Sequence, residues 1–372
     1  MNAPLLLVGL DGLHHDQRWS RLCAELGFDV HFHAMVGLTS ALTGLTEDPV
    51  ETHLAEDARR RLADHIDVLQ PFAVHALGSH PAGFLAQDGL SRASHRAPLV
   101  VHIRGGAELE LYRYSPAYEA RLHTLFASAS GVIADNALSY LSAREYGFSD
   151  PLQLNFVTAL PGNCGEDLAI NRAPRSRSEP PVIVWPKASA SPNTDPYPVI
   201  EAVGRLWRRG RRFKVIAFGL AWPELELHAR RCFSGVPSAD FVASPSTSRE
   251  MFLATLQQAD ILLSPSMFDG ISNVLLEAMA AGLTPIVSFH PAIPDELRVG
   301  GDILFADNLI VPEIEVALET ALDLPDAERQ RQVTRNAAWV GRHCDRCRIL
   351  CDVEAFYRRL ADAFASARGT DA

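Results

Sequence analysis

The stretch from Ala259 to Phe289 reads ADILLSPSMFDGISNVLLEAMAAGLTPIVSF, and it decides how the chain around it folds. Ile261 to Leu263 is a short apolar run that predicts a buried strand, and the Ser-Pro-Ser and Asp-Gly groups after it predict a turn. Val274 to Ala281 has helical periodicity and stops at a glycine. The run Thr284 to Phe289 is rich in β-branched residues and predicts a second, parallel strand. The stretch is therefore expected to form a βαβ unit.

The turn before this helix has the chemistry of an anion site. The first amides of a helix have no intrahelical partner and the helix dipole adds positive charge, so an anion docks there on the backbone. Gly270 lets a ligand approach the main chain closely. Asp269 and Glu277 lie about two turns apart on roughly the same face. Because carboxylates repel phosphate but accept hydrogen bonds from hydroxyls, the two acids indicate a ligand that carries sugar as well as phosphate.

These residues carry a resemblance to a known family. The run P-S-x-x-D-G-x-x-N-x-x-L-E-A-M-A-x-G-x-x-P, which starts at Pro265, resembles the nucleotide-sugar-binding signature of the retaining glycosyltransferases of family four. The family's usual form is an acid, seven residues and then Glu, and here Asp269 takes the place of the commoner first Glu. The alternative is an ordinary βαβ unit with a capped helix.

The resemblance implies an α/β fold of two facing Rossmann-like domains (GT-B) with an interdomain cleft. It runs weakly through the N-terminal half and strongly from Val182 to Leu322. The length of 372 residues suffices for two domains. We expect an N-terminal acceptor-binding domain at 1–172, a C-terminal nucleotide-sugar-binding domain at 182–345 and, at 346–372, a helix that returns to the first domain. The Pro-, Ser- and Arg-rich segment Arg172 to Pro181 is the expected linker.

Composition and charge limit the partners. The hydrophobic share of 47% and the charged share of 21% are typical of a globular protein, and neither a signal peptide nor a long apolar run is found, so a cytoplasmic location is expected. The net charge of -11 argues against nucleic acid. The basic stretches Arg205 to Arg212 and Arg172 to Arg177 leave a peripheral membrane contact open, with a solvated helix end and a linker as the alternative. The oligomeric state stays open.

Six cysteines are present, and three of them form C-x-x-C-x-x-x-C at Cys344, Cys347 and Cys351. This pattern occurs in metal and iron–sulfur sites. The same spacing is one face of an amphipathic helix and no matching ligand pair lies nearby, so we expect reduced thiols packed in a C-terminal helix. The histidines, most of them in the first third of the chain, fit no ligand set. No metal and no cofactor are expected.

The N-terminal half opens with strand, loop, helix and strand, which places its first loop at the carboxyl end of a sheet. In the resembled family a Gly-Gly pair often sits in this loop against the donor phosphate, and here Gly12 alone holds the position. Leu99 to Ile103 predicts a later strand that ends at Arg104, beside the ligand crevice. The segment VVHIRGG resembles the family's strand end where a His or Arg faces the donor sugar and the leaving phosphate, which implies a role for Arg104 and, less directly, His102. A loop salt bridge and a buried histidine are the alternatives.

After the linker the strand and helix pattern restarts at Val182. The family usually has an Arg after this strand and a Lys about six residues later, and both clamp the diphosphate. Lys187 holds the first of these positions and Asn193 the second, so the clamp is halved. Gly219, which closes the strand predicted at Phe213 to Phe218, is included among the donor-binding residues.

The resemblance implies retaining transfer of a sugar from a nucleotide diphosphate sugar to an acceptor hydroxyl. The catalytic candidates are Arg104, Asp269 and Glu277, with Glu277 at the ribose. The donor-binding candidates are Gly12, Lys187, Gly219, Gly270, Ile271, Ser272, Asn273, Val274 and Glu277. The donor nucleotide, its sugar and the acceptor stay open. Two alternatives remain: a non-catalytic GT-B scaffold or binding subunit, and another GT-B enzyme such as a phosphorylase or an epimerase.

Overall fold

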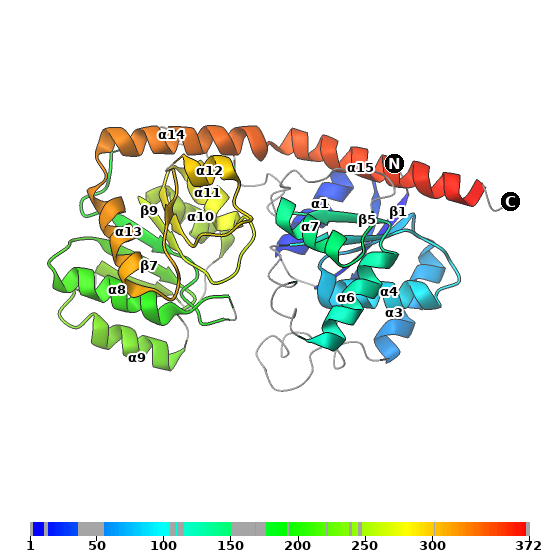
Figure 1. Cartoon of the computed structure of the whole chain (residues 1–372), viewed down its shortest axis with the longest axis horizontal. Helices are drawn as coiled ribbons and strands as arrows, with labels where there is room; N and C mark the ends of the chain where they lie inside the picture. The colour runs from blue at the N-terminus through cyan, green and yellow to red at the C-terminus, as the bar shows by residue number, and fades with distance from the viewer. Residues whose placement is uncertain are drawn as a thin grey trace. The chain divides into compact units, whose positions relative to one another are not determined.

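The computed structural model describes residues 3–10, 14–35, 56–104, 109, 115–149, 168, 176–191, 193–220, 222–237, 240–244, 248–300 and 302–369. The chain divides into two compact units, an N-terminal unit of residues 1–166 with 346–372 and a C-terminal unit of residues 167–345. Each unit is a parallel sheet with helices on both faces, so the expected α/β class with two Rossmann-like domains is confirmed (Figure 1). The cleft expected between the domains stays a prediction.

The N-terminal unit is built on a five-stranded sheet in the order β2-β1-β3-β4-β5. Its strands are β1 (Pro4–Gly9), β2 (Asp29–Ala34), β3 (Ala73–Ala76), β4 (Leu99–Ile103) and β5 (Gly131–Ala134). Its helices are α1 (His14–Glu25), α3 (Glu56–Leu69), the π-helix η2 (Ser79–Gly83), α4 (Phe84–Arg92), α6 (Pro116–Ser128), α7 (Ala137–Glu145) and α15 (Arg346–Gly369).

The C-terminal unit is built on a six-stranded sheet in the order β11-β10-β9-β6-β7-β8. Its strands are β6 (Val182–Trp185), β7 (Lys214–Phe218), β8 (Phe241–Ser244), β9 (Ile261–Ser264), β10 (Thr284–Val287) and β11 (Leu304–Phe305). Its helices are α8 (Pro196–Arg208), α9 (Pro223–Cys232), α10 (Arg249–Gln258), α11 (Asn273–Ala281), α12 (Asp295–Val299), α13 (Val311–Asp323) and α14 (Asp326–His343).

Alternating side chains of the N-terminal sheet form two cores. Leu6 and Val8 of β1 face one core with α3, α4 and α6, whereas Leu5 and Leu7 face the other with α1 and α15. This alternation follows from the period of two in a strand, and it lets a short strand serve both faces. The C-terminal helix α15 contributes Phe356 to the second core, so the last segment of the chain completes the first domain.

The strand order of the C-terminal unit creates a switch point. In the unit's own order, β6 is the first strand and β9 the fourth, and these two pair directly, as in the dinucleotide-binding order 3-2-1-4-5-6. Helices α8, α9 and α13 share one core, while α11 packs on α10 and α14. In open parallel sheets the crevice beyond the carboxyl ends of two such strands is where ligands bind.

Of the expected linker at 172–181, the structure describes residues 176–181, and the linker stays a prediction. The described part of that segment belongs to the C-terminal unit, where the Arg177 guanidinium donates to the backbone carbonyl oxygen of Ala321 at 2.7 Å and to that of Leu322. The division between the two compact units falls between Glu166 and Asp167. No helix in the described ranges is long and apolar enough to cross a membrane.

The expectation for the cysteine triplet was partly wrong. Cys344, Cys347 and Cys351 carry no disulfide, but only Cys344 is buried. Cys344 is the C-cap residue of α14, and Cys347 is the second residue of α15, so the helix is broken between them. The triplet therefore does not share one helix, and the thiols of Cys347 and Cys351 are exposed instead of packed.

Candidate functional site

Three predicted residues meet at the switch point of the C-terminal sheet. Lys187 follows β6 and Asp269 follows β9, and the two form an ion pair between Nζ and Oδ2. The backbone amide of Gly270 donates to the other carboxylate oxygen of Asp269 at 3.0 Å. The two loops are also joined by the amide of Met267, which donates to the carbonyl oxygen of Asn193 at 2.7 Å. A cation and an anion therefore lie side by side at the carboxyl edge of the sheet.

The next four predicted residues form the entry to α11. Ile271 is buried at 4% exposure, and Ser272 is the N-cap residue, although its side chain makes no capping hydrogen bond. Asn273 and Val274 are the first two residues of the helix. A helix start that lacks a side-chain cap keeps its positive end available to a phosphate. This end of α11 lies directly after the Asp269 loop.

Glu277 lies inside the C-terminal unit and is fully buried. Its two carboxylate oxygens accept hydrogen bonds from the guanidinium of Arg249, at 2.6 and 2.9 Å, and Arg249 is the first residue of α10. Arg249 therefore already occupies the two carboxylate oxygens that Glu277 is expected to offer to the ribose hydroxyls. The ribose contact stays a prediction, and the ion pair provides a way to test it.

Arg104 lies at the end of β4 and is anchored within the N-terminal unit. Its guanidinium forms an ion pair with Asp16 of α1 and donates to the carbonyl oxygen of Leu77, which follows β3. Asp16 is 1% exposed and also accepts from the amide of Leu10 at 2.8 Å. A side chain on Gly9 would collide with the Asp16 carboxylate, since an added Cβ would lie 2.3 Å from Oδ2. The Arg104–Asp16 salt bridge and its hydrogen bonds thus connect the carboxyl ends of β1, β3 and β4.

Two predicted glycines and His102 are less informative. Gly12 lies outside the described residues. Gly219 has a φ of +92°, and an added Cβ would lie 3.4 Å from Ser189 Cβ, so a tight turn explains this glycine. His102 is buried at 2% exposure and packs edge-on against Trp19, with 4.6 Å between the ring centroids. Burial holds the pKa of His102 well below its usual value, so the ring is neutral at neutral pH.

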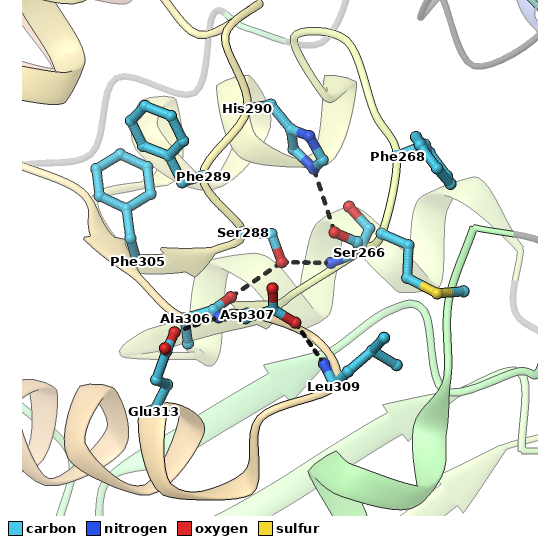
Figure 2. A pocket seen from close by; sticks show the side chains of 11 residues that line it. Ser266, Phe268, Ser288, Phe289, His290, Phe305, Ala306, Asp307, Leu309 and Glu313 are labelled. Carbon is cyan, nitrogen blue, oxygen red and sulfur yellow. Dashed lines mark hydrogen bonds between the residues drawn. The ribbon is translucent and has the colours of Figure 1, made fainter. Parts of the chain in front are cut away.

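A pocket of about 460 Å³ lies at the carboxyl ends of β9, β10 and β11 (Figure 2). Its lining residue Phe268 directly precedes Asp269 in the chain. Its aromatic part is formed by Phe268, Phe289 and Phe305, of which Phe289 is 55% exposed. The other lining residues are Ser266, Met267, Ser288, His290, Ala306, Asp307, Leu309 and Glu313.

The polar groups of this pocket are mainly hydrogen-bond acceptors. Ser288 is already used, since its hydroxyl donates to the carbonyl oxygen of Ala306 at 2.9 Å. Nε2 of His290 lies 3.2 Å from the carbonyl oxygen of Ser266, which accepts its proton and leaves Nδ1 as an acceptor (Figure 2). Burial lowers the pKa of His290, so the ring is uncharged at neutral pH. Among the described lining residues the charged groups are the carboxylates of Asp307 and Glu313, so this part of the pocket repels anions and suits hydroxyl groups.

Sequence reasoning missed Arg249, Asp16 and His290. Arg249 had one recognisable signal, because a cation in the first turn of a helix opposes the helix dipole and therefore needs a carboxylate nearby. Asp16 and His290 had none, since an acid in the first turn of a helix and a histidine after a strand are both common. Their partners come from distant parts of the chain, at Arg104 and at the Asp269 loop.

The basic stretch at the end of α8 is neutralised by the unit itself. Arg205 and Arg209 contact Glu315 of α13, and Arg211 forms an ion pair with Asp323. Arg205 also bonds Glu201 within its own helix, at 3.0 Å. These contacts favour the solvated helix end over the membrane contact, which stays an open alternative.

The comparison with known families points to the same unit. Residues 181–323 match the family model of the glycosyl transferases group 1. The match contains Lys187, Asp269 and Glu277, and it does not extend to the N-terminal unit. No curated protein matches the chain by sequence.

Solved structures resemble the whole chain in fold. Alpha,alpha-trehalose 6-phosphate synthase from Burkholderia multivorans aligns at a TM-score of 0.68 and 12% identity, over 99% of this chain and 98% of that chain. Sucrose-phosphate synthase from Thermosynechococcus elongatus aligns at 0.66 and 15%, over 97% and 100%. A putative UDP-N-acetylglucosamine 2-epimerase from Listeria monocytogenes aligns at 0.63 and 11%, over 94% of each chain. At such identities the likeness shows the GT-B fold, and together with the family match it supports a transferase enzyme.

Proposed function

We propose that this protein transfers a sugar from a nucleotide diphosphate sugar to an acceptor hydroxyl, with retention, as in glycosyltransferase family four. The observation that carries the proposal is the Lys187–Asp269 pair at the switch point, directly before α11 and inside the family match. An ammonium group and helix amides suit a diphosphate, whereas a carboxylate suits sugar hydroxyls. Donor binding is thus expected to separate Lys187 from Asp269, with the phosphates bound to Lys187 and the sugar bound to Asp269.

The adjoining pocket supports a sugar in this position. Its acceptor groups match hydroxyl donors, and its exposed Phe289 and Phe268 offer apolar faces to the C–H face of a sugar ring. Asp307 and Glu313 would repel the diphosphate, which keeps the phosphates on the Lys187 side. The negative charge of the pocket therefore favours the sugar there, and the positive charge of Lys187 favours the phosphates on the other side of the loop.

Positive charge is expected to stabilise the leaving nucleoside diphosphate. Lys187 and the amides at the start of α11 would neutralise the departing diphosphate, and Arg104 is the candidate for the same task from the N-terminal unit. In the resembled family the leaving phosphate itself takes the acceptor proton on the same face of the sugar, and no protein nucleophile is needed. We extend that mechanism, and a cytoplasmic location, to this chain as parts of the proposal.

Saturation-transfer NMR with uridine, guanosine and thymidine diphosphate sugars tests the proposal. We expect at least one donor to show transfer at both its nucleotide and its sugar protons. The Lys187→Ala variant should lose the signal, while Cys347→Ser, which alters an exposed thiol of the other unit, should keep it. If no nucleotide sugar binds to the folded protein, the donor assignment is wrong.

The rival functions predict different products. An epimerase would convert the nucleotide sugar without an acceptor, a scaffold would bind it unchanged, and a transferase would release the nucleoside diphosphate when an acceptor is present. The likeness in fold to a putative epimerase is the observation that keeps the first rival in view. Product analysis of each donor by chromatography, with and without a panel of acceptors, separates the three. A phosphorylase would instead require inorganic phosphate for sugar release.

A further inference from the structure

Three metal-ligating side chains gather on the C-terminal unit, on helices that carry none of the donor-site candidates. They are Glu201 of α8 and His228 and Cys232 of α9. Their ligand atoms all lie within 4.8 Å of one another, and each side chain is partly exposed. Cys232 Sγ lies 3.6 Å from His228 Nε2 and 3.6 Å from Glu201 Oε2.

The packing of α8 on α9 brings these residues together. Gly204 of α8 faces the end of α9, where an added Cβ would lie 2.9 Å from the carbonyl oxygen of Cys232. This position therefore needs a glycine if the two helices are to approach so closely. On α9 itself His228 and Cys232 are four residues apart, which places them on the same helical face, toward α8.

The second oxygen of Glu201 is held by neighbouring arginines. Its Oε1 accepts from Arg205 Nε at 3.0 Å and lies 3.8 Å from Arg208, whereas Oε2 turns to the thiol. Such outer contacts orient a ligating carboxylate and leave one oxygen for a metal. The His228 ring is placed by an edge contact with Tyr197, at 5.0 Å between centroids.

We propose that Glu201, His228 and Cys232 form a zinc site with one open position for water. In a tetrahedral zinc site with ordinary Zn–S and Zn–N bond lengths, sulfur and nitrogen ligand atoms lie about 3.5 Å apart. The sulfur–nitrogen distance and the sulfur–oxygen distance are both 3.6 Å, close to this separation, and the nitrogen and oxygen ligand atoms lie within 4.8 Å of each other, so the three atoms can converge on one metal ion. One thiolate, one imidazole and one carboxylate suit zinc better than the hard cations magnesium or calcium.

Binding is a simple exchange of a proton for a metal. The S–H bond of Cys232 breaks, a Zn–S bond forms, the proton leaves to solvent, and the zinc ion stays divalent. The site joins α8 to α9 on the face of the sheet that these helices share with α13. A zinc ion bound there would stabilise the packing of α8 on α9. The zinc proposal does not depend on the proposed sugar transfer.

Metal titration of untagged, reduced full-length protein tests the site. Zinc should bind at one equivalent, and cobalt in its place should give the visible spectrum of a tetrahedral site with a thiolate charge-transfer band. Cys232→Ser and His228→Gln should each weaken zinc binding at least about a hundredfold. Zinc should also raise the unfolding temperature of the wild type and leave that of Cys232→Ser unchanged.

The matched control is Cys347→Ser, since Cys347 is an exposed thiol next to another histidine-bearing segment. It should bind zinc like the wild type. Circular dichroism confirms that each variant is folded, and Glu201→Gln serves as a second ligand variant if Cys232→Ser is unstable. Sub-stoichiometric zinc in the wild type, or equal binding by folded Cys232→Ser, overturns the proposal.

Discussion

Arg249 and Glu277 form a bidentate ion pair in which the carboxylate is fully buried and the guanidinium side chain is 23% exposed. Arg249 comes from the first turn of α10 and Glu277 from the middle of α11, so the pair joins the two helices on one face of the sheet. The guanidinium also lies over the Phe252 ring, 5.7 Å from its centroid. The acid that the resemblance places at the donor ribose is thus a structural anchor between two helices.

The first prediction separates these two roles of Glu277. Arg249→Ala removes a bidentate guanidinium from a fully buried carboxylate and should lower the free energy of unfolding by about 3 kcal/mol. Adding Glu277→Gln should recover part of this stability. If Glu277 also accepts hydrogen bonds from the ribose, Glu277→Gln alone should weaken nucleoside diphosphate binding by about tenfold or more in calorimetry. Unchanged nucleotide affinity in the folded variant assigns Glu277 to structure alone.

The second prediction concerns the Lys187–Asp269 pair. Asp269→Asn should lower kcat more than it raises the donor KM, because in the proposed site the carboxylate would orient the sugar ring at the reacting carbon. Asp269→Glu, which restores the resembled family's usual acid, should keep much of the activity. Lys187→Ala should mainly raise the donor KM, since it removes charge from the phosphate side. Steady-state kinetics with purified donor measure the effects on kcat and on donor KM separately. If the Asp269 variant changed mainly KM and the Lys187 variant mainly kcat, the roles assigned to the two residues would have to be exchanged.

The third prediction is that sugar transfer needs no metal ion. In the proposed donor site, the helix start and Lys187 would supply the positive charge that a divalent cation would otherwise give to the diphosphate. The test is best made in the Cys232→Ser background, so that a chelator does not act through the proposed zinc site. Activity should survive EDTA in this variant. Loss of activity that manganese restores would show that the phosphate site has been assigned wrongly.

The fourth prediction concerns Arg104 and its buried partner Asp16. Arg104→Ala should destabilise the N-terminal unit by about 3 kcal/mol, because Asp16 would stay buried without its cation. The pair variant Asp16→Asn with Arg104→Gln should be closer to wild type. Should Arg104 also stabilise the leaving diphosphate, a folded Arg104→Lys variant would show a lower kcat with little change in donor affinity. If the kcat of this variant falls only in proportion to the fraction of protein that is folded, the role of Arg104 is purely structural.

The fifth prediction is an acid-sensitive N-terminal unit. His75 is fully buried, with Trp19 Nε1 donating to its Nδ1 at 3.2 Å, and burial lowers its pKa to about 3. Because the folded pKa is lower than the unfolded value of about 6.5, stability is fully present above pH 6.5 and falls as the pH drops toward 3. Urea unfolding should therefore give a lower free energy at pH 5 than at pH 7.5. His75→Gln should be less stable at pH 7.5 and show a weaker pH dependence, and an unchanged pH dependence would contradict the prediction.

The sequence by itself determined the fold class and one side of the candidate site. Strand runs, glycine stops and the Asp269 to Glu277 spacing are local patterns, and local patterns define strands, helix starts and the residues at strand ends. Lys187 was implied only by the resemblance to family four. In a parallel sheet the ends of these strands meet at one edge, which explains why Lys187 and Asp269 lie together although 82 residues separate them.

Only the tertiary structure decided which side chains become partners. Arg249 on Glu277, Asp16 on Arg104 and the Glu201, His228 and Cys232 cluster each join different elements, and a sequence period describes one element at a time. The same limit explains the cysteine triplet, whose spacing fits one helix although the chain ends α14 at His343 and starts α15 at Arg346. Side-chain pairing depends on how helices pack across a sheet, and that packing is set by the whole core, not by any one segment.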